Sequence, residues 1–268
     1  MTPQDLTPST PPSHDLGPGW HDEELRTADG VRLAGHVLVP GREPVAAVVL
    51  VHGFTASGTH PDVVAQARLL ADAGFAVVTY DSRGHGASGG WCTLGDDERH
   101  DVAAAVAVAA RLQPQVVVVG ASMGAIAALR YAATAGDVDG IRGVVAVSGP
   151  AQWRLPLTLI GVLNALLIRT RLGRRLLARH AKVRVGSGWS RPEPPDALVA
   201  RLTMPVTIMH GTLDRIIRLP TARLLHAAAR EPRQLVIVEG MGHAFHRRAH
   251  PAVVEAVRWT LDQVAASP

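Results

Sequence analysis

The chain has 268 residues, of which 47% are hydrophobic and 19% charged, a composition that can bury a sizeable core and excludes a disordered chain. Its one cysteine, Cys92, excludes an intramolecular disulfide and a zinc site made of cysteines. The net charge of +4 conceals an asymmetry, because residues 151–191 carry nine basic and no acidic side chains, while the rest of the chain has 18 basic and 23 acidic residues. This basic block is internal, interleaved with leucine and without an RNA-binding or zinc-finger motif, so we do not expect binding to nucleic acid.

The amino-terminal residues differ in composition from the rest. Residues 1–19 contain five prolines and lack the basic start and apolar core of a secretory signal, which favours a flexible extension and a cytoplasmic protein. The longest apolar stretch, Leu155–Ile168, is shorter than the roughly 20 residues of a membrane span and contains Pro156 and Asn164. We therefore expect a globular protein without a transmembrane helix.

Strand and helix patterns alternate along the remaining chain. We expect the following elements in order: a β-hairpin at 21–26 and 31–39, a strand at 45–51, a helix from 61 to 73, a strand at 75–80, a helix from about 96 to 112, a strand at 116–119, a helix at 122–135 and a strand at 144–147. The alternation stops at Pro150 and resumes with a strand at 206–210, a helix from about 219, a strand at 235–239 and a helix at 251–264.

This alternation predicts an α/β fold with a mostly parallel sheet and helices on both faces. Continuous β-branched runs such as Val45–Val51 are typical of strands that are buried on both sides. We expect residues 20–150 and 201–268 to form one core, and residues 151–200 to form a helical cap inserted at the rim of the sheet.

A candidate nucleophile lies between the 116–119 strand and the following helix. Residues 120–124 read Gly-Ala-Ser-Met-Gly, the G-x-S-x-G pattern of a nucleophile elbow in the strand–turn–helix context that the motif requires. The glycines permit a sharp reversal that leaves the hydroxyl of Ser122 exposed at the positive end of a helix. The alternative is an ordinary tight turn.

A serine hydroxyl needs a general base, and His243 is the candidate. It follows the last expected strand in a Gly-Met-Gly-His-Ala-Phe segment, so it should reach the same carboxyl edge of the sheet as Ser122. His246 is the competing candidate, and His250 lies too close to the start of the last helix.

Asp214 is the candidate for the carboxylate that orients the base. It follows the penultimate strand, at the same edge. The order Ser122, Asp214, His243 is that of α/β-hydrolases and differs from the orders in the trypsin and subtilisin folds. A turn or helix-cap role is the alternative for Asp214, and Glu239 is a weaker candidate for the acid.

Backbone N–H groups must stabilise the oxyanion that forms during attack on a carbonyl. Met123, the residue after the nucleophile, should supply one of them. The other should come from the loop that follows the 45–51 strand, where residues 52–54 read His-Gly-Phe, and Phe54 is our choice. A simple glycine turn with a packed phenylalanine is the alternative.

Together these motifs resemble the α/β-hydrolase superfamily and, within it, the serine aminopeptidase (S33) and monoacylglycerol-lipase-like group. The resemblance extends from about residue 20 to the end, except for the insertion. It includes a further segment, residues 81–89, that reads Asp-Ser-Arg-Gly-His-Gly-Ala-Ser-Gly. In that family this segment is mostly structural. Many relatives have histidine where this chain has Ala121. Neither a metal-ligand pair nor a dinucleotide fingerprint is present, so no metal or cofactor is expected.

The expected activity is hydrolysis of a carboxylic ester through an acyl-enzyme, with a small-molecule acyl ester as the substrate and with Ser122, His243 and Asp214 as a triad. A thioesterase, amidase or acyltransferase with the same triad is an alternative, because fold and triad do not select the acyl donor or acceptor. A hydrolase-like binding protein without activity is a further alternative.

The insertion allows two interpretations. Leu155, Leu159, Leu163, Leu166 and Leu167 recur at helical spacing, and arginines occupy many of the positions that follow. The first interpretation is a cap that packs on the rim with solvated arginines. The second is a lid whose leucines line an acyl pocket and whose basic face contacts an anionic lipid surface or substrate.

Overall fold

The valine- and alanine-rich runs of the sequence form the centre of one twisted sheet. In the computed structural model, which describes residues 16–134, 141–153, 166–188 and 192–266, eight strands lie in the order β1-β2-β4-β3-β5-β6-β7-β8. They are β1 (Trp20–Arg26), β2 (Arg32–Leu38), β3 (Ala46–Val51), β4 (Phe75–Tyr80), β5 (Val116–Ala121), β6 (Ile141–Val147), β7 (Val206–Gly211) and β8 (Arg233–Val238). The hairpin strand β2 is antiparallel to β1 and to β4, and the other pairs are parallel. The predicted α/β fold with a mostly parallel sheet is confirmed.

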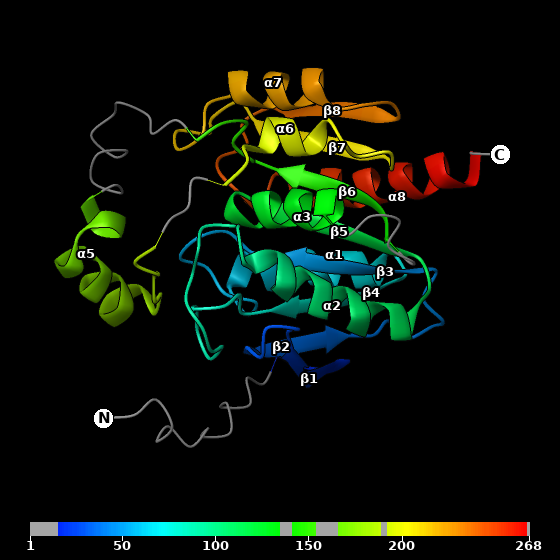
Figure 1. The fold of residues 1–268 in the computed structure, drawn as a ribbon. Coiled ribbons are helices and arrows are strands. Elements are labelled where there is room, and N and C mark those ends of the chain that lie inside the picture. The colour runs from blue at the N-terminus through cyan, green and yellow to red at the C-terminus, as the bar shows by residue number, and fades with distance from the viewer. Residues whose placement is uncertain (1–15, 135–140, 154–165, 189–191, 267–268) are drawn as a thin grey trace.

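Helices cover both faces of this sheet, as Figure 1 shows. On one side lie α1 (Pro61–Asp72) and α8 (His250–Ala266), and on the other lie α2 (Glu98–Leu112), α3 (Met123–Thr134), α6 (Pro195–Val199) and α7 (Pro220–Ala228). Because side chains alternate along a strand, Val117 and Val119 of β5 pack toward α1 and α8, whereas Val116 and Val118 pack toward the other layer. The central strands β3, β4, β5 and β7 are therefore buried on both faces and hold their loops on a rigid base.

Two strands, β6 and β8, begin two or more residues earlier than the sequence pattern predicts. β6 begins at Ile141, which pairs with Val116 across an irregularity in register, and β8 begins at Arg233, which pairs with Val206. In both cases the neighbouring strand supplies hydrogen-bonding partners for residues that the hydrophobic pattern leaves out. Tertiary pairing, and not local composition, sets these two boundaries.

Part of the expected insertion lies beyond the carboxyl-terminal ends of the parallel strands. There a short helix, α5 (Arg171–Leu176), continues into one π-helical turn, η1 (Leu177–Ala181) (Figure 1). Two isolated bridges, His85 with Val183 and Cys92 with Val185, connect this segment to the loop after β4. Of the leucines expected at helical spacing, Leu155, Leu159 and Leu163 lie outside the described residues. Within the described part of the chain, no helix has the length and apolar character to span a membrane.

Candidate active site

Ser122 lies at a sharp turn between β5 and α3. Its φ of +54° is in the left-handed region, which a residue with a side chain rarely adopts. The turn requires the flanking glycines: a Cβ at Gly120 would lie 2.3 Å from the carbonyl oxygen of Gly124, and a Cβ at Gly124 would lie 2.3 Å from that of Val51. The geometry is that of a nucleophile elbow, with a strained serine held between two close backbone contacts.

The backbone around Ser122 fixes this turn to the neighbouring strand and helix. Its N–H donates to the carbonyl of Val147 at 2.9 Å, and its own carbonyl accepts from Ala125 at 3.1 Å at the start of α3. The side chain is only half-buried and lines a cavity of about 90 Å³. The hydroxyl of Ser122 is thus presented to an open space above the carboxyl edge of the sheet.

His243 and Asp214 meet at that edge because β7 and β8 are adjacent parallel strands. Their loops approach so closely that a Cβ at Gly211 would lie 2.2 Å from the carbonyl oxygen of Met241. Nδ1 of His243 lies 2.8 Å from Oδ2 of Asp214. Since a carboxylate only accepts hydrogen bonds, Nδ1 carries the proton, and Nε2 keeps a lone pair that can accept one. His243 lines the same cavity as Ser122.

The carboxylate of Asp214 is held in its charged form. Burial raises its pKa, but the hydrogen bond and charge interaction with His243 and the backbone N–H groups of Ile217 and Ile216 outweigh burial, so that the pKa lies below its usual value. The two N–H groups donate to Oδ1 at 2.9 Å each, which leaves Oδ2 for His243. A second, fully buried histidine, His210, places Nε2 at 3.5 Å from Oδ2 and donates from it to the carbonyl of Ile217 at 2.8 Å.

The two residues expected to form the oxyanion hole flank Ser122. Phe54 lines the cavity together with Ser122, and the preceding Gly53 is so close that a Cβ there would lie 3.3 Å from Cβ of Ser122. Met123 begins α3, whose first N–H groups have no partners within the helix. Neither the N–H of Phe54 nor that of Met123 donates a hydrogen bond to any residue that the structure describes. Both are available to a ligand.

The competing candidates have other contacts. His246 accepts a hydrogen bond at Nδ1 from the N–H of Arg248 at 3.3 Å and does not line the cavity. His250 is buried and bonded through Nε2 to the carbonyl of Phe245 at 3.0 Å. Glu239 is exposed and accepts from the hydroxyl of Thr212 at 3.1 Å. Of these histidines and carboxylates, the structure brings only His243 and Asp214 together.

The segment at residues 81–89 forms a structural network beside the site. Asp81 accepts from the N–H groups of Gly58 and Ala87 at 2.9 Å each, and Arg83 pairs with the fully buried Asp101 at 2.8 Å. Cys92, after this segment, is fully buried, and burial raises the pKa of its thiol. A thiol in that environment is unreactive, which agrees with a packing role.

Three further residues of the cavity wall come from the start of α1: His60, Asp62 and Val63. The sequence motifs do not predict a role for these three residues. Pro61 is the sequence signal that could have indicated them. Proline favours the first position of a helix, so a helix that begins there puts these side chains just after the loop that contains Phe54. His60 acts as the helix cap, because its Nδ1 accepts from the N–H of Asp62 at 3.3 Å.

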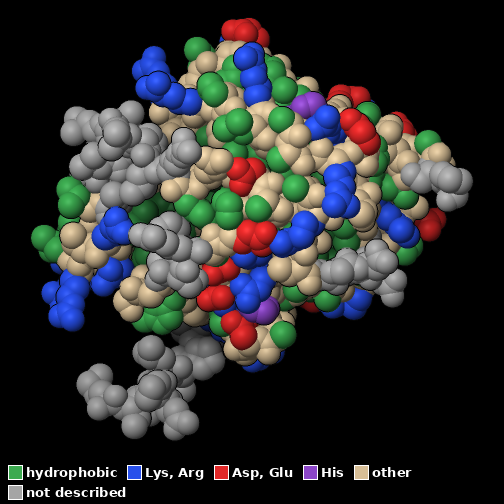
Figure 2. Space-filling view, turned by 45° about the horizontal axis from the view of Figure 1, so that its top comes forward, with side chains coloured by type: hydrophobic (Ala, Val, Ile, Leu, Met, Phe, Trp, Pro, Cys, Tyr) green, Lys and Arg blue, Asp and Glu red, His purple; other side chains and the backbone are tan. Residues whose placement is uncertain are grey.

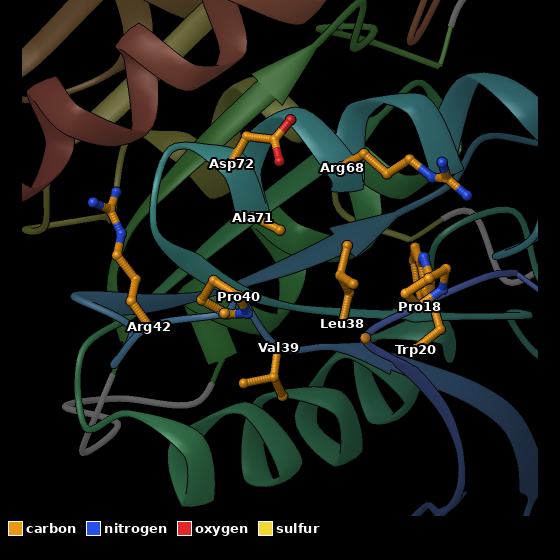
Figure 3. A pocket seen from close by; sticks show the side chains of 11 residues that line it. Pro18, Trp20, Leu38, Val39, Pro40, Arg42, Arg68, Ala71 and Asp72 are labelled. Atoms are coloured by element: carbon orange, nitrogen blue, oxygen red, sulfur yellow. The ribbon is translucent and has the colours of Figure 1, made fainter.

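A larger hollow, of about 720 Å³, lies at the opposite edge of the sheet (Figure 3). Trp20, Leu38 and Ala71 contribute to its walls, and Arg42, Arg68 and Asp72 are its charged side chains. It contains neither serine nor histidine, so its size does not make it the better candidate for acyl transfer. Within the described ranges, no cluster of three or more His, Cys, Asp or Glu side chains could hold a metal ion.

Comparisons with known proteins agree with this fold. Residues 48–257 match the model of the alpha/beta hydrolase family. The chain is 29% identical over 251 residues to a monoacylglycerol lipase of Mycolicibacterium smegmatis, with 80% of this chain and 86% of the relative covered. Two solved structures have similar folds. The esterase Pf2001 of Pyrococcus furiosus is 22% identical with a TM-score of 0.69, and the match covers 93% of this chain and 94% of that one. An esterase of Thermogutta terrifontis is 21% identical with a TM-score of 0.67, and the match covers 91% of this chain and 99% of that one.

Proposed function

The chain belongs to the alpha/beta hydrolase family and is esterase- or lipase-like within it, and from this premise we propose that it is a serine hydrolase of carboxylic esters. One observation supports this proposal most strongly. His243 lines the same cavity as the strained, half-buried Ser122, and its Nδ1 is hydrogen-bonded to Asp214 at 2.8 Å. A serine, a histidine that can accept a proton and a carboxylate that holds that histidine are the three groups that such a mechanism needs, and they come here from three separate loops.

The proposed reaction begins with attack of the Ser122 Oγ on the ester carbonyl while Nε2 of His243 takes the hydroxyl proton. Asp214 holds the imidazole through Nδ1 and stabilises the imidazolium that forms. The negative charge moves to the carbonyl oxygen, which accepts hydrogen bonds from the N–H groups of Phe54 and Met123. These donors act only once the charge has developed, so they lower the barrier and do not simply tighten substrate binding.

The tetrahedral intermediate then collapses. His243 gives its proton to the departing alcohol, and the acyl group stays on Ser122 as an ester. A water molecule, deprotonated by His243, attacks this acyl-enzyme and releases the carboxylic acid. The enzyme returns to its starting protonation state. No metal or organic cofactor takes part in any proposed step.

A fluorophosphonate probe tests the nucleophile, because only an activated serine reacts with it. We expect stoichiometric labelling of the protein, mapped to the peptide that contains Ser122 by mass spectrometry, and no labelling of Ser122→Ala. Ser82→Ala is the matched control: Ser82 is a fully buried serine at the same edge, and its variant should label as the native protein does. Labelling at another residue, or none in the folded native protein, would refute the serine mechanism.

A substrate panel tests the ester assignment separately. The 4-nitrophenyl butyrate ester, a butyryl thioester and a butyryl anilide share one acyl group and differ only in the leaving group. We expect the highest kcat/KM for the ester. A higher value for the thioester or the anilide would retain the triad and reassign the enzyme to a thioesterase or an amidase.

A further inference from the structure

The described part of the insertion, residues 166–188, carries the strongest positive charge of the molecule. It contains no acidic residue and seven basic ones, which are Arg169, Arg171, Arg174, Arg175, Arg179, Lys182 and Arg184. Most are exposed to solvent. We call this surface the cationic cap face. It contrasts with the rest of the chain, in which acidic residues outnumber basic ones.

The charge of the cationic cap face is not neutralised locally. Arg169, Arg171, Arg175, Arg179 and Lys182 form no ion pair with any residue of the described ranges, and residues 151–191 contain no carboxylate side chain. Arginines elsewhere do pair, such as the exposed Arg258 with Glu255 at 2.7 Å. Like charges on one short helix repel each other, and no acidic partner within this segment offsets that repulsion. Contact with a negatively charged surface would reduce it and would therefore be favourable.

Large apolar side chains project among these cations. Leu172 and Leu176 of α5 are 68% and 42% exposed, and one helical turn separates them, so that they lie on the same side of the helix. Leu166 is 55% exposed just before the helix. Figure 2 shows the two kinds of side chain together at the left end of the molecule, where α5 lies, without an acidic side chain among the described atoms there. Exposed leucine beside arginine is the composition of helices that lie in a membrane interface.

An exposed indole extends this surface. Trp91 is 61% exposed, and its Cβ lies 3.8 Å from the position that a Cβ would take on Gly186, at the end of the same segment. Tryptophan is enriched at the level of lipid headgroups, because its ring is apolar and its N–H is polar.

The inner side of this segment packs on the candidate active site. The buried Leu177 belongs to one apolar cluster with Met123, and Phe54 packs against that cluster. Leu167 and Ile168 are half-buried in the same cluster. A surface that engaged the outer side of the segment would therefore lie one layer of side chains away from the proposed oxyanion hole.

We propose that the cationic cap face docks the protein on an anionic lipid bilayer, with Leu172 and Leu176 inserted among the lipids. The charge pattern alone would suit any polyanion. The exposed leucines favour a bilayer, because a nucleic acid or an inorganic polyanion offers no apolar phase in which to bury them. This inference goes beyond the proposed function and does not depend on it, since binding to a bilayer can be measured in the absence of catalysis.

Vesicle flotation tests the proposal directly. The native full-length chain should float with vesicles of phosphatidylglycerol and phosphatidylcholine in equal amounts, remain in solution with pure phosphatidylcholine, and lose most binding in 0.5 M NaCl because salt screens the charges. Arg171→Gln with Arg175→Gln should weaken binding about tenfold or more, since each cation near an anionic surface contributes up to about 1 kcal/mol, or about fivefold.

A second pair of substitutions separates lipid insertion from charge attraction. Leu172→Ser with Leu176→Ser keeps every charge and should also weaken binding about tenfold. Arg223→Gln with Leu224→Ser, at exposed positions of α7, is the matched control and should bind as the native chain does. Circular dichroism verifies that each variant is folded.

Two results would overturn the proposal. The first is undiminished vesicle binding by the leucine variant, which would indicate a purely electrostatic surface for a soluble polyanion. The second is absence of binding by the native protein at low salt.

Discussion

Asp81 and Asp214 are two buried carboxylates at the same edge of the sheet, and they use their oxygens differently. Asp81 follows β4, and both of its oxygens accept backbone N–H groups, from Gly58 and Ala87. Asp214 follows β7, and it uses Oδ1 for two backbone N–H groups and leaves Oδ2 to His243. A carboxylate that binds only backbone holds loops together. A carboxylate with one oxygen reserved for a side chain can orient that side chain for chemistry.

The same distinction separates two histidines. In His52, Nε2 accepts from the N–H of Ser82 at 2.9 Å and Nδ1 donates to the carbonyl of Gly53 at 2.8 Å, so both nitrogens serve the backbone. Among the described residues His243 has a hydrogen-bond partner only at Nδ1, which leaves Nε2 for a substrate or a nucleophile. Two residues of the same type can thus have different roles. The residue whose polar atoms are all hydrogen-bonded to the backbone is structural, and the residue with a polar atom left over can take part in chemistry.

The largest expected effect concerns the choice of base. His243→Ala should lower kcat/KM for 4-nitrophenyl butyrate by about 10⁴ or more, because the serine loses the group that takes its proton. His246→Ala, its matched control three residues away, should retain activity within about threefold. Steady-state kinetics on both variants, with circular dichroism to verify folding, tests this difference. Equal losses in the two variants would mean that the base is misassigned.

A somewhat smaller loss is expected for Asp214→Asn. The amide cannot hold the imidazole in the tautomer with the proton on Nδ1, so kcat should fall by about 10³ to 10⁴. The side chain keeps its shape, and Oδ1 can still accept from Ile216 and Ile217, so the urea midpoint should change little. A stable variant with near-native kcat would remove Asp214 from the triad.

Asp81→Asn should show the opposite signature. The new NH₂ group would face a backbone N–H, so that two donors meet and one of the two hydrogen bonds of residue 81 is lost. The free energy of unfolding should fall by about 2–3 kcal/mol. The activity of the folded fraction should drop less than about tenfold. Urea denaturation and kinetics on the same preparation measure both quantities. If this variant lost activity as Asp214→Asn does and kept its stability, the division between the two carboxylates would fail.

The smallest effect is a pH dependence of stability that comes from His52. Burial, with repulsion from His85, lowers its pKa to about 3. The unfolded chain, with a histidine pKa near 6.5, therefore binds a proton that the folded chain excludes, and stability is lost as the pH falls from about 6.5 toward 3. Between pH 7.5 and pH 5 this group should remove about 2 kcal/mol.

Urea denaturation of the native chain and of His52→Gln at the two pH values isolates this contribution, because the other titrating groups are common to both. The variant should be less stable at pH 7.5, and its loss on acidification should be smaller by about 2 kcal/mol. Parallel curves for the two proteins would show that His52 is not the group responsible.

Much of the architecture follows from local patterns in the sequence. The β-branched runs predict the central strands, and the glycines at 120 and 124 predict the turn at Ser122, where the structure has Cβ positions within 2.3 Å of backbone atoms. The acidic residues at 96–98 predict the start of α2. The sequence could not show that Glu98 turns back to accept hydrogen bonds from Thr93 and Gly95, because that role depends on where the preceding loop lies.

The sequence by itself determined the order of strands and helices and the loops that reach the carboxyl edge, because strand and helix periods are properties of adjacent residues. Only the tertiary structure decided which of the neighbouring histidines meets Asp214. In the loop after β8 side chains follow no period, and their directions depend on which residues are anchored. Met241 and Phe245 are buried in the core, and Ala244 adopts a φ of +57° between them. Those anchors direct His243 toward Asp214 and leave His246 outside the cavity.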